Sequence, residues 1–564
     1  MNVVKSGALL ACLVIAFDPT AQAAGAAGFG FGVAAGDVTT TSARLWTRSD
    51  ETGRVTLRLS RKGHVVQRYN SRADPANDNT VQVRAHDLRP GTRYRYAFQI
   101  GERVSDTGVF ETAPGPRLRR TISFAFSGDA DGAPAPGSSG PFYNHFEVYA
   151  RMNAERNDFN VNLGDTIYSD SEISGLPPAL NVADKWAKYR QNLSYANLQL
   201  LRRSAALYSE WDDHEFANDF SLAEGGAPLY DAGRKAFLDY APASYGPQLG
   251  LYRKFRWGRN VELFILDERS FRSAKASAGT ACENPFGSIR SDLAPTAPQR
   301  LRNAFGFVIP ALRKPAPKAC LDAIADPRRT FLGRFQLRRF LHDVRRSRAT
   351  FKVILNETPI QQFYALPYDR WEGYAAERAK VLRYLKRRVK NVVFLTTDTH
   401  ANMVTDVRLR TLEPGGPKGT GILEAVTGPV ATKTFAREID EATGLSGAGN
   451  TVGRLFFKPP PPAGVGMKCA ALDVYSYDEV KVTSRRLTIT PKDIAGRPVR
   501  EPGGTRCGPY TIIRASNEMP GVTEAAKIES PKDAGRPHTQ VVCGRPRTLG
   551  DDDLQPRQAW RVFC

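Results

Sequence analysis

Six short apolar segments of this chain each run directly into acidic residues or histidine, and this recurrence restricts the folds open to it. The segments span residues 122–127, 159–163, 205–211, 261–266, 351–355 and 392–396. Short, continuously apolar runs are typical of strands buried on both faces. The stretches between them include helical patterns, such as residues 332–341, where apolar residues alternate at helical spacing with Arg and His. The sequence therefore predicts an α/β fold with a central sheet covered by helices.

The polar residues at the ends of these segments occupy one recurring position. They are Asp129 and Asp131, Asp165 and Tyr168, Asp212 to Glu215, Asp267 to Arg269, Asn356 and Glu357, and Asp398 with His400. Open α/β sheets bind ligands beyond the carboxyl ends of their strands, so we expect these side chains to face one crevice. Carboxylates at such close range need compensation, and bound cations supply it.

The predicted ligand set is mainly oxygen, with few imidazoles and no cysteine. Such a set favours hard ions, namely calcium, manganese, magnesium or ferric iron, and the Tyr168 phenol suits ferric iron. Each motif alone has a structural alternative. The Asp165 motif could be a capped turn, and a lone Asp267 or Asn356 is more often a structural hydrogen-bonding group. The common position of the motifs, strand after strand, favours one shared metal site.

Residues 28–115 have an all-β pattern and precede the α/β region. Alternating apolar, aromatic and β-branched residues fall in four stretches, 43–47, 55–60, 80–85 and 94–100, which turn residues separate. The stretch 88–96 is similar to the corner of a fibronectin-type β-sandwich. We therefore predict an N-terminal β-sandwich domain over residues 28–115, a linker at Pro114 to Pro116, and the α/β domain over residues 118–496.

The chain begins with the pattern of an export signal. Lys5 precedes an apolar run from Ala8 to Phe17, and Ala21-Gln22-Ala23 fits a cleavage site. We predict a signal peptide over residues 1–23 of the general secretory type, because there is no twin-arginine pair. The mature protein would be secreted or periplasmic. No later apolar run is long enough for a transmembrane segment.

Seven cysteines are present, and removal of the signal with Cys12 leaves six, an even number that fits an oxidising compartment. About fifteen pairings are open, and we expect the nearest-neighbour pairs Cys282–Cys320, Cys469–Cys507 and Cys543–Cys564. Their spacing lacks the short pairs of a zinc site, so they are predicted to be structural disulfide bonds. Residues 275–325 are interpreted as a loop insertion, and residues 497–564 as a disulfide-pinned C-terminal extension.

The formal net charge of +21 and the isoelectric point near 9.7 are unusual for a soluble protein. A basic surface attracts phosphate esters, acidic lipid headgroups and other polyanions. The basic residues are spread along the chain, so a solvated basic surface is the alternative, and no dedicated nucleic-acid module is present.

Several blocks in register resemble one known family. They are residues 31–37 with 45–48, 163–168, 211–215, 266–272, 356–360 and 371–374. In these blocks the chain resembles the PhoD-type alkaline phosphatases, a branch of the calcineurin-like metallophosphoesterases. The resemblance implies a metallophosphoesterase αββα sandwich, preceded by an N-terminal fibronectin- or Ig-like β-sandwich domain. It also implies hydrolysis of phosphomonoesters, phosphodiesters or both.

The resemblance further implies a metal cluster, with Fe³⁺ and Ca²⁺ expected and Mn²⁺ or Zn²⁺ as alternatives. Carried over by position, Asp165 would bridge two metals, Tyr168 and His400 would bind the first, and Asp213 and Asp398 the others. Asn356 is a candidate ligand, and His214 would lie beside the leaving group. In this hypothesis a metal-bound hydroxide attacks phosphorus in line while His214 protonates or orients the leaving oxygen. Arg269 or Arg272 is assigned to the phosphate on chemical grounds.

Two residues depart from the family pattern. Asp129 stands where the family usually has a cysteine, which makes iron less certain, and Asp131 could serve as the ligand instead. Thr397 stands where a glycine is usual. Two alternatives therefore stay open: a phospholipase D-like or nucleotide phosphodiesterase, which the basic charge suits, and a non-catalytic secreted binding protein with a degenerate phosphoesterase domain.

Overall fold

The computed structural model describes residues 26–138, 140–173, 175–283 and 291–515. The predicted signal peptide, residues 1–23, and the predicted pair Cys543–Cys564 lie outside the described residues. Within that part, no helix is long and apolar enough to cross a membrane.

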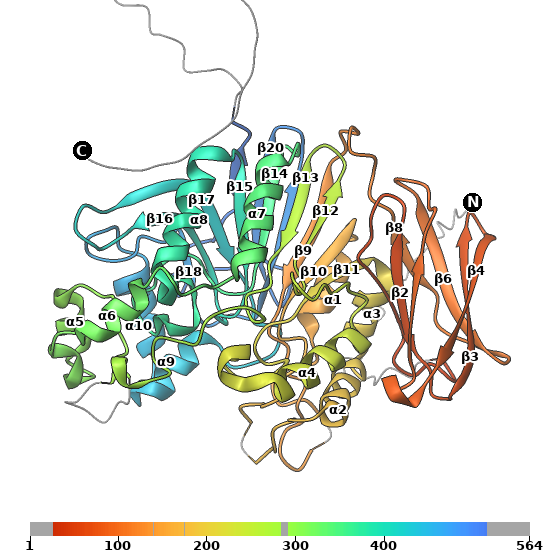
Figure 1. The fold of residues 1–564 in the computed structure, drawn as a ribbon, viewed down its shortest axis with the longest axis horizontal. Helices are drawn as coiled ribbons and strands as arrows, with labels where there is room; N and C mark the ends of the chain where they lie inside the picture. The colour runs from red at the N-terminus through yellow and green to blue at the C-terminus, as the bar shows by residue number, and fades with distance from the viewer. Residues whose placement is uncertain (1–25, 139, 174, 284–290, 516–564) are drawn as a thin grey trace, which may run out of the picture. The chain divides into compact units, whose positions relative to one another are not determined.

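Two mixed β-sheets form the centre of the protein (Figure 1). The six predicted apolar segments are confirmed as parallel strands, three in each sheet. They are β9 (Ile122–Ser127), β10 (Phe159–Leu163) and β11 (Ala206–Glu210) in one sheet, and β13 (Val261–Ile265), β14 (Phe351–Asn356) and β15 (Val392–Thr396) in the other. Nearly all of their residues are buried, including the polar ones, such as Asn160 and Asn162 of β10.

The nine-stranded sheet has the order β21-β20-β19-β9-β10-β11-β1-β2-β5, and the seven-stranded sheet has the order β12-β13-β14-β15-β17-β16-β18. The remaining strands of these sheets that follow the N-terminal region are β12 (Arg253–Trp257), β16 (Asn402–Arg410), β17 (Lys418–Val426), β18 (Cys469–Ala471), β19 (Ser476–Val482), β20 (Arg486–Asp493) and β21 (Tyr510–Ile513).

The two sheets pack face to face, and helices cover their outer faces (Figure 1). Alternate residues of one strand point to opposite layers: Val353 of β14 is in the core between the sheets, whereas Ile354 packs against helices. Helices α1 (Glu147–Ala154), α2 (Val182–Leu193), α3 (Ala196–Ser204) and α4 (Leu222–Tyr240) share a core with the outer face of the nine-stranded sheet. Helices α7 (Arg334–Arg346) and α8 (Ala375–Arg388) cover the seven-stranded sheet. The helix predicted around residues 332–341 is therefore confirmed as part of α7.

The N-terminal strands are joined to this core through a shared sheet. They are β1 (Val33–Gly36), β2 (Ala43–Arg48), β3 (Gly53–Arg61), β4 (His64–Ala73), β5 (Thr80–Ala85), β6 (Arg93–Ile100), β7 (Arg103–Val104) and β8 (Gly108–Glu111). Strand β1 pairs in parallel with β11, so β1, β2 and β5 extend the nine-stranded sheet. The other five strands form a second sheet, whose buried residues share the core with β2 and β5.

The described part of the insertion at residues 275–325, which leaves out 284–290, contains two short α-helices and is closed by a disulfide bond. The helices are α5 (Gln299–Phe305) and α6 (Lys318–Ala325), and the bond joins Cys282 to Cys320. A second bond joins Cys469 to Cys507, so two of the three expected pairs are confirmed. Strand β21 pairs with β20, which keeps the chain in the sheet beyond residue 496. Two further helices, α9 (Phe435–Thr443) and α10 (Ala448–Val452), follow β17.

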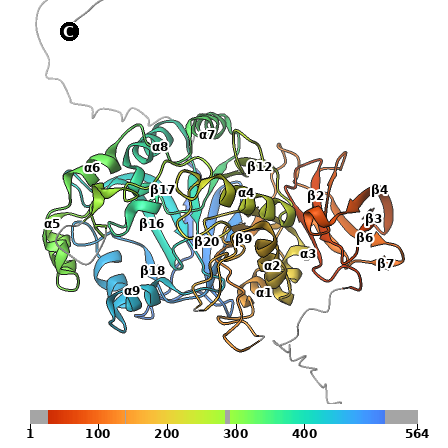
Figure 2. The same cartoon turned by 60° about the horizontal axis from the view of Figure 1, so that its bottom comes forward.

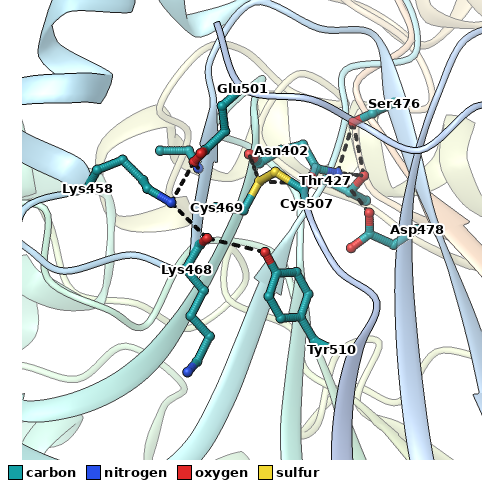
Figure 3. The surroundings of a disulfide bond; sticks show 11 residues. Asn402, Thr427, Lys458, Lys468, Cys469, Ser476, Asp478, Glu501, Cys507 and Tyr510 are labelled. Atoms are coloured by element: carbon teal, nitrogen blue, oxygen red, sulfur yellow. Dashed lines mark hydrogen bonds and ion pairs between the residues drawn. A yellow bond between two sulfur atoms is a disulfide. The ribbon is translucent and has the colours of Figure 1, made fainter. Parts of the chain in front are cut away.

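A buried polar cluster lies beside the second disulfide bond (Figure 3). The Asn402 amide donates a hydrogen bond to Asp478 Oδ1 at 2.8 Å and another to Thr427 Oγ1 at 3.1 Å. The second carboxylate oxygen of Asp478 has no hydrogen-bond partner in the described part of the chain. Burial therefore raises the pKa of Asp478 to about 7.

We expect Asp478→Asn to stabilise the protein above neutral pH. The Asp478 carboxyl has an ordinary pKa of 3.8 and a folded pKa of about 7, so the folded state binds the extra proton between these values. The free energy of unfolding therefore falls as the pH rises from about 4 to 7, by roughly 4 kcal/mol at most, and the asparagine removes this loss. Thermal melts at pH 4.5 and pH 8 should show similar stabilities at the lower pH and a more stable variant at the higher pH. A variant less stable than the wild type at pH 8 would contradict the burial argument.

Candidate metal centre

The loops that follow β9, β10, β11 and β15 bring the predicted ligands together. Three groups of side chains each offer ligand atoms within 4.8 Å of one another. They are Asp129 with Asp165 and His400; Asp165 with Asp213 and His214; and Asp212 with Asp213 and Asp398. Because Asp165 belongs to the first two groups and Asp213 to the last two, the groups form one continuous row. All of these residues except Asp398 are buried.

Unusual backbone conformations position these side chains. Four candidate ligands have left-handed φ angles: Asp129 (64°), Asp165 (48°), Asp398 (67°) and His400 (52°). Such angles are costly for residues with a Cβ and gather at functional sites, where the surrounding structure enforces them. Position 164 of the Asp165 motif requires glycine, because its φ is 88° and a Cβ there would lie 2.5 Å from the Asp212 Cβ.

Glu215 holds two of the loops in register. Its carboxylate accepts hydrogen bonds from the Thr166 and Asp212 amides, both at 2.7 Å, and from the Asp165 amide at 3.2 Å. Sequence reasoning gave Glu215 no role, although its place in the acidic motif after β11, Asp212 to Glu215, indicated that it lies near the site. A buried carboxylate that accepts several N–H groups fixes the loop that carries it.

Both histidines are oriented by carboxylates that the sequence did not single out. The Nδ1 atom of His214 lies 2.7 Å from Asp170 Oδ1, and that of His400 lies 2.7 Å from Glu438 Oε1 on α9. The Tyr168 hydroxyl is 2.9 Å from His400 Nε2, and the Tyr168 ring stacks on His214 with 4.0 Å between the ring centroids. A carboxylate at Nδ1 fixes the ring and directs Nε2 toward the site, an arrangement typical of metal-ligating histidines. Asp170 lies in the loop after β10, two residues beyond Tyr168, and Glu438 lies on α9; sequence reasoning gave neither residue a role.

The carboxylates are electrostatically crowded. Burial, followed by the charges of neighbouring carboxylates, raises the pKa of Asp165, Asp212 and Asp398 well above the ordinary value. Burial also raises the pKa of Asp129 to about 6. One buried oxygen of Asp129 and one of Asp212 have no hydrogen-bond partner among the described residues. An oxygen-rich donor set with unsatisfied, destabilised carboxylates fits hard metal cations.

Burial has the opposite effect on the histidines, but the net shift of their pKa values is also upward. Burial lowers the pKa of His214, but the charges of Asp165, Asp213 and Asp170 outweigh it and raise the pKa well above the ordinary value. For His400 burial acts in the same way, and Glu438 and Asp129 raise the pKa to about 9.

Arg269 lies inside the row of carboxylates and has no exposed surface. Its guanidinium forms ion pairs with Asp212, with Asp369 at 2.6 Å, with Asp398 at 3.3 Å and with Asp213 at 3.4 Å, and lies 3.8 Å from Glu357. Arg272 is also buried and is bonded to Asp369 and to the carbonyl groups of Asp219 and Phe220. Both guanidinium groups that we assigned to the phosphate are therefore committed to protein carboxylates and carbonyls.

Asn356 is hydrogen-bonded within the protein. Its amide oxygen accepts a hydrogen bond from Trp371 Nε1 at 3.1 Å, and its NH₂ donates to the Thr358 carbonyl. Asp267 accepts hydrogen bonds from Trp211 and Ser270, which matches the structural alternative for that residue. Of the other predicted ligands, the structure brings together Asp129, Asp165, Tyr168, Asp213, Asp398 and His400.

The two departures from the family pattern have simple local explanations. The Thr397 hydroxyl donates to the Leu163 carbonyl at 2.5 Å, and its backbone is outside the left-handed region, so a glycine is not required there. Asp129 points its unpaired oxygen toward Gly428, where a Cβ would lie 2.4 Å from it. Asp131 is satisfied by the Ala133 amide and the Ser171 hydroxyl, which leaves Asp129 as the acid of the first ligand group.

Cys469, Glu501 and Cys507 also lie close together. The two cysteines form a disulfide bond, so they cannot act as thiolate ligands.

Comparisons with known proteins agree on one family. The profile of the family described as PhoD-like phosphatase matches residues 135–454, and that of the PhoD-like phosphatase N-terminal domain matches residues 16–114. Alkaline phosphatase D of Bacillus subtilis (strain 168) is 25% identical over 432 residues, which cover 68% of this chain and 66% of that protein. The alignment thus spans just under two thirds of that relative. A solved structure of PhoD aligns with a TM-score of 0.64 at 20% identity, covering 87% of this chain and 90% of the other, so the two share a fold.

Proposed function

The chain belongs to the PhoD-like phosphatase family, and from that premise we propose that it is a secreted, metal-dependent phosphoesterase that hydrolyses phosphomonoesters, phosphodiesters or both. The row of three ligand groups that share Asp165 and Asp213 carries the proposal. Two disulfide bonds support an oxidising, extracytoplasmic location. We also propose that residues 28–115 form a fibronectin-like module.

The side chains suggest which residues would hold the metals. Asp129, Tyr168 and His400 surround one end of the row and would hold the first metal together with Asp165. Asp165 would bridge to the second metal, which Asp213 would also bind, and Asp398 lies in the group beyond it. Oxygen donors predominate, so we propose Fe³⁺ with Ca²⁺, with Mn²⁺ or Zn²⁺ as alternatives.

When bound, the metals would neutralise the non-bridging phosphate oxygens and acidify water for in-line attack. Protein side chains would position the groups that transfer protons and compensate charge. Asp170 holds Nδ1 of His214, which leaves Nε2 free to donate a proton to the leaving oxygen. Tyr168 stacks on the same ring and restricts its rotation. Arg269 offsets the charge of Asp212, Asp213 and Asp398 from within the protein.

Removal of metal should abolish activity. We expect chelator-treated protein to lose at least about a hundredfold in turnover of p-nitrophenyl phosphate and its bis-ester, because the metals supply several kcal/mol of transition-state stabilisation. Activity should return on addition of Fe³⁺ and Ca²⁺. The ratio of the two rates would separate a monoesterase from the phospholipase D-like or nucleotide diesterase alternative.

Two results would contradict the proposal. Full activity in protein shown to be metal-free by elemental analysis would exclude the metal mechanism. Metal-loaded protein that turns over neither ester would favour a non-catalytic binding protein.

A further inference from the structure

Helices α7 and α8 lie side by side on the outer face of the seven-stranded sheet (Figures 1 and 2). Their inner sides are apolar and buried: Leu337, Phe340 and Val344 of α7 pack in one cluster with Val381 and Leu385 of α8. Because the sheet uses these inner sides, the other sides of both helices are presented to solvent. Among the α-helices that the structure describes, only these two contribute residues to this apolar cluster.

The solvent sides of the two helices are almost uniformly basic. We define the α7–α8 basic face as the exposed residues Arg334, Arg338, Arg339, Arg345, Arg346, Arg348, Lys380, Arg383, Lys386, Arg387, Arg388 and Lys390. Each helix contains a single acidic residue, and both are buried. Asp343 is ion-paired with Lys254 and Arg339, and Glu377 accepts hydrogen bonds from the Phe331 and Leu332 amides. The face therefore has no exposed carboxylate of its own.

Most of these cations also lack a partner elsewhere. Among the described residues, only Arg339 of the basic face forms an ion pair. Like charges at neighbouring positions of a helix destabilise it, so this array is a cost to the isolated protein. Packing against the sheet does not explain the array of basic residues, because their side chains point to solvent. Contact with an anionic partner would offset the repulsion.

The geometry of the face indicates which partner it fits. The basic residues come from two adjacent helices, so they form a two-dimensional array instead of a single row that would follow a linear polyanion. Phe335 is 47% exposed on α7, and the guanidinium groups of Arg334 and Arg338 lie 5.2 Å and 5.1 Å from its ring centroid. An exposed aromatic ring among arginines suits the headgroup region of a membrane, where guanidinium groups bind lipid phosphates.

We propose that the α7–α8 basic face docks the protein on an anionic lipid bilayer. The candidate metal centre lies in the loops after β9, β10, β11 and β15, and it contains no residue of the basic face. Docking through this face would therefore engage none of the ligand residues. The proposal concerns binding alone and does not rest on the proposed hydrolytic activity.

Co-sedimentation with lipid vesicles tests the proposal. The test variant is Arg338→Gln/Arg345→Gln/Arg383→Gln/Arg387→Gln, which keeps good helix formers at exposed positions. The matched control is Arg54→Gln/Arg58→Gln/Arg68→Gln/Arg72→Gln, which removes the same charge from exposed positions of β3 and β4. Vesicles of phosphatidylcholine with and without phosphatidylglycerol serve as the probe, and turnover of p-nitrophenyl phosphate in solution reports on the rest of the protein.

The wild type and the control should bind the anionic vesicles and not pure phosphatidylcholine. The test variant should bind at least tenfold more weakly, with unchanged turnover and a melting temperature no lower than that of the wild type, because four of the mutually repelling charges are removed. Binding should also weaken between 0.05 M and 0.5 M salt, because the Debye length falls from roughly 14 Å to about 4 Å. No binding by the wild type, or equal weakening in the control, would overturn the proposal. Tighter binding of the wild type to duplex DNA than to anionic vesicles would overturn the proposal and indicate that the partner of the basic face is a linear polyanion.

Discussion

Asp165→Asn is expected to lower kcat for phosphate esters by about 10³-fold or more, the largest loss of any single substitution that we predict. Asp165 is the one residue shared by the ligand groups of His400 and His214. An amide carries no charge, so the variant loses the negative charge that would hold two metals together. Its oxygen can still accept the His214 backbone amide, now at 3.1 Å, so the loop should keep its shape. Activity assays and elemental analysis of the purified variant would measure the effect.

The control for this substitution is Asp322→Asn on α6. Asp322 is exposed and pairs only with Lys318 in the described structure, so turnover and metal content should stay at wild-type levels. A loss of less than tenfold in Asp165→Asn, with metal content unchanged, would show that Asp165 does not bridge the metals.

Arg269→Met is expected to destabilise the protein by about 3–5 kcal/mol, because it removes the buried counter-charge of several carboxylates. Methionine fills much of the same volume without the charge. The carboxylates of Asp212, Asp369 and Asp398 would then be left in a buried site without a guanidinium group. Denaturant unfolding of the wild type and the variant at the same pH would measure the loss of unfolding free energy.

Kinetics of the same variant separate two roles for Arg269. If the guanidinium binds substrate phosphate, as sequence reasoning suggested, KM should rise while stability is preserved. If it serves as an internal counter-charge, stability and kcat should fall together. Arg68→Met on the exposed surface of β4 is the control and should change neither quantity. Wild-type stability in Arg269→Met would contradict the internal role.

Most residues of the candidate metal centre could be predicted because the ends of buried strands can be located in the sequence. Buried parallel strands are rich in apolar residues, so the acidic residues and histidines that follow them stand out in the sequence. Asp129, Asp165, Asp213, Asp398 and His400 were identified in this way, and the structure brings them together.

The residues that sequence reasoning missed are those whose partners lie far away in the chain. Glu438 reaches His400 from α9, and Asp170 reaches His214 across 44 positions. Asn356 is the last residue of β14, and its amide oxygen accepts a hydrogen bond from Trp371, which the sequence did not show. A strand-end position shows that a side chain is near the crevice, and it does not show in which direction the side chain points.

In the N-terminal region, too, contacts between distant segments could not be predicted from the sequence. Its strands were predicted from alternating residues, but the sharing of a sheet through β1 and β11 was not. Backbone hydrogen bonds form that contact, and they leave no side-chain pattern in the sequence. Gly36 is a local trace of the close approach of β11, because a Cβ there would lie 3.0 Å from the Leu207 carbonyl oxygen.

The sequence by itself determined the six buried strands, the acidic residues and histidines at their ends, the family and two disulfide pairs. Only the tertiary structure decided that Arg269 pairs with buried carboxylates, that Asp170 and Glu438 contact the Nδ1 atoms of the histidines, and that the basic residues of α7 and α8 form one face. One physical reason explains why the sequence did not show these last features. Hydrophobic periodicity and residue type are local properties, whereas ion pairs, hydrogen-bond partners and shared surfaces depend on how distant segments pack.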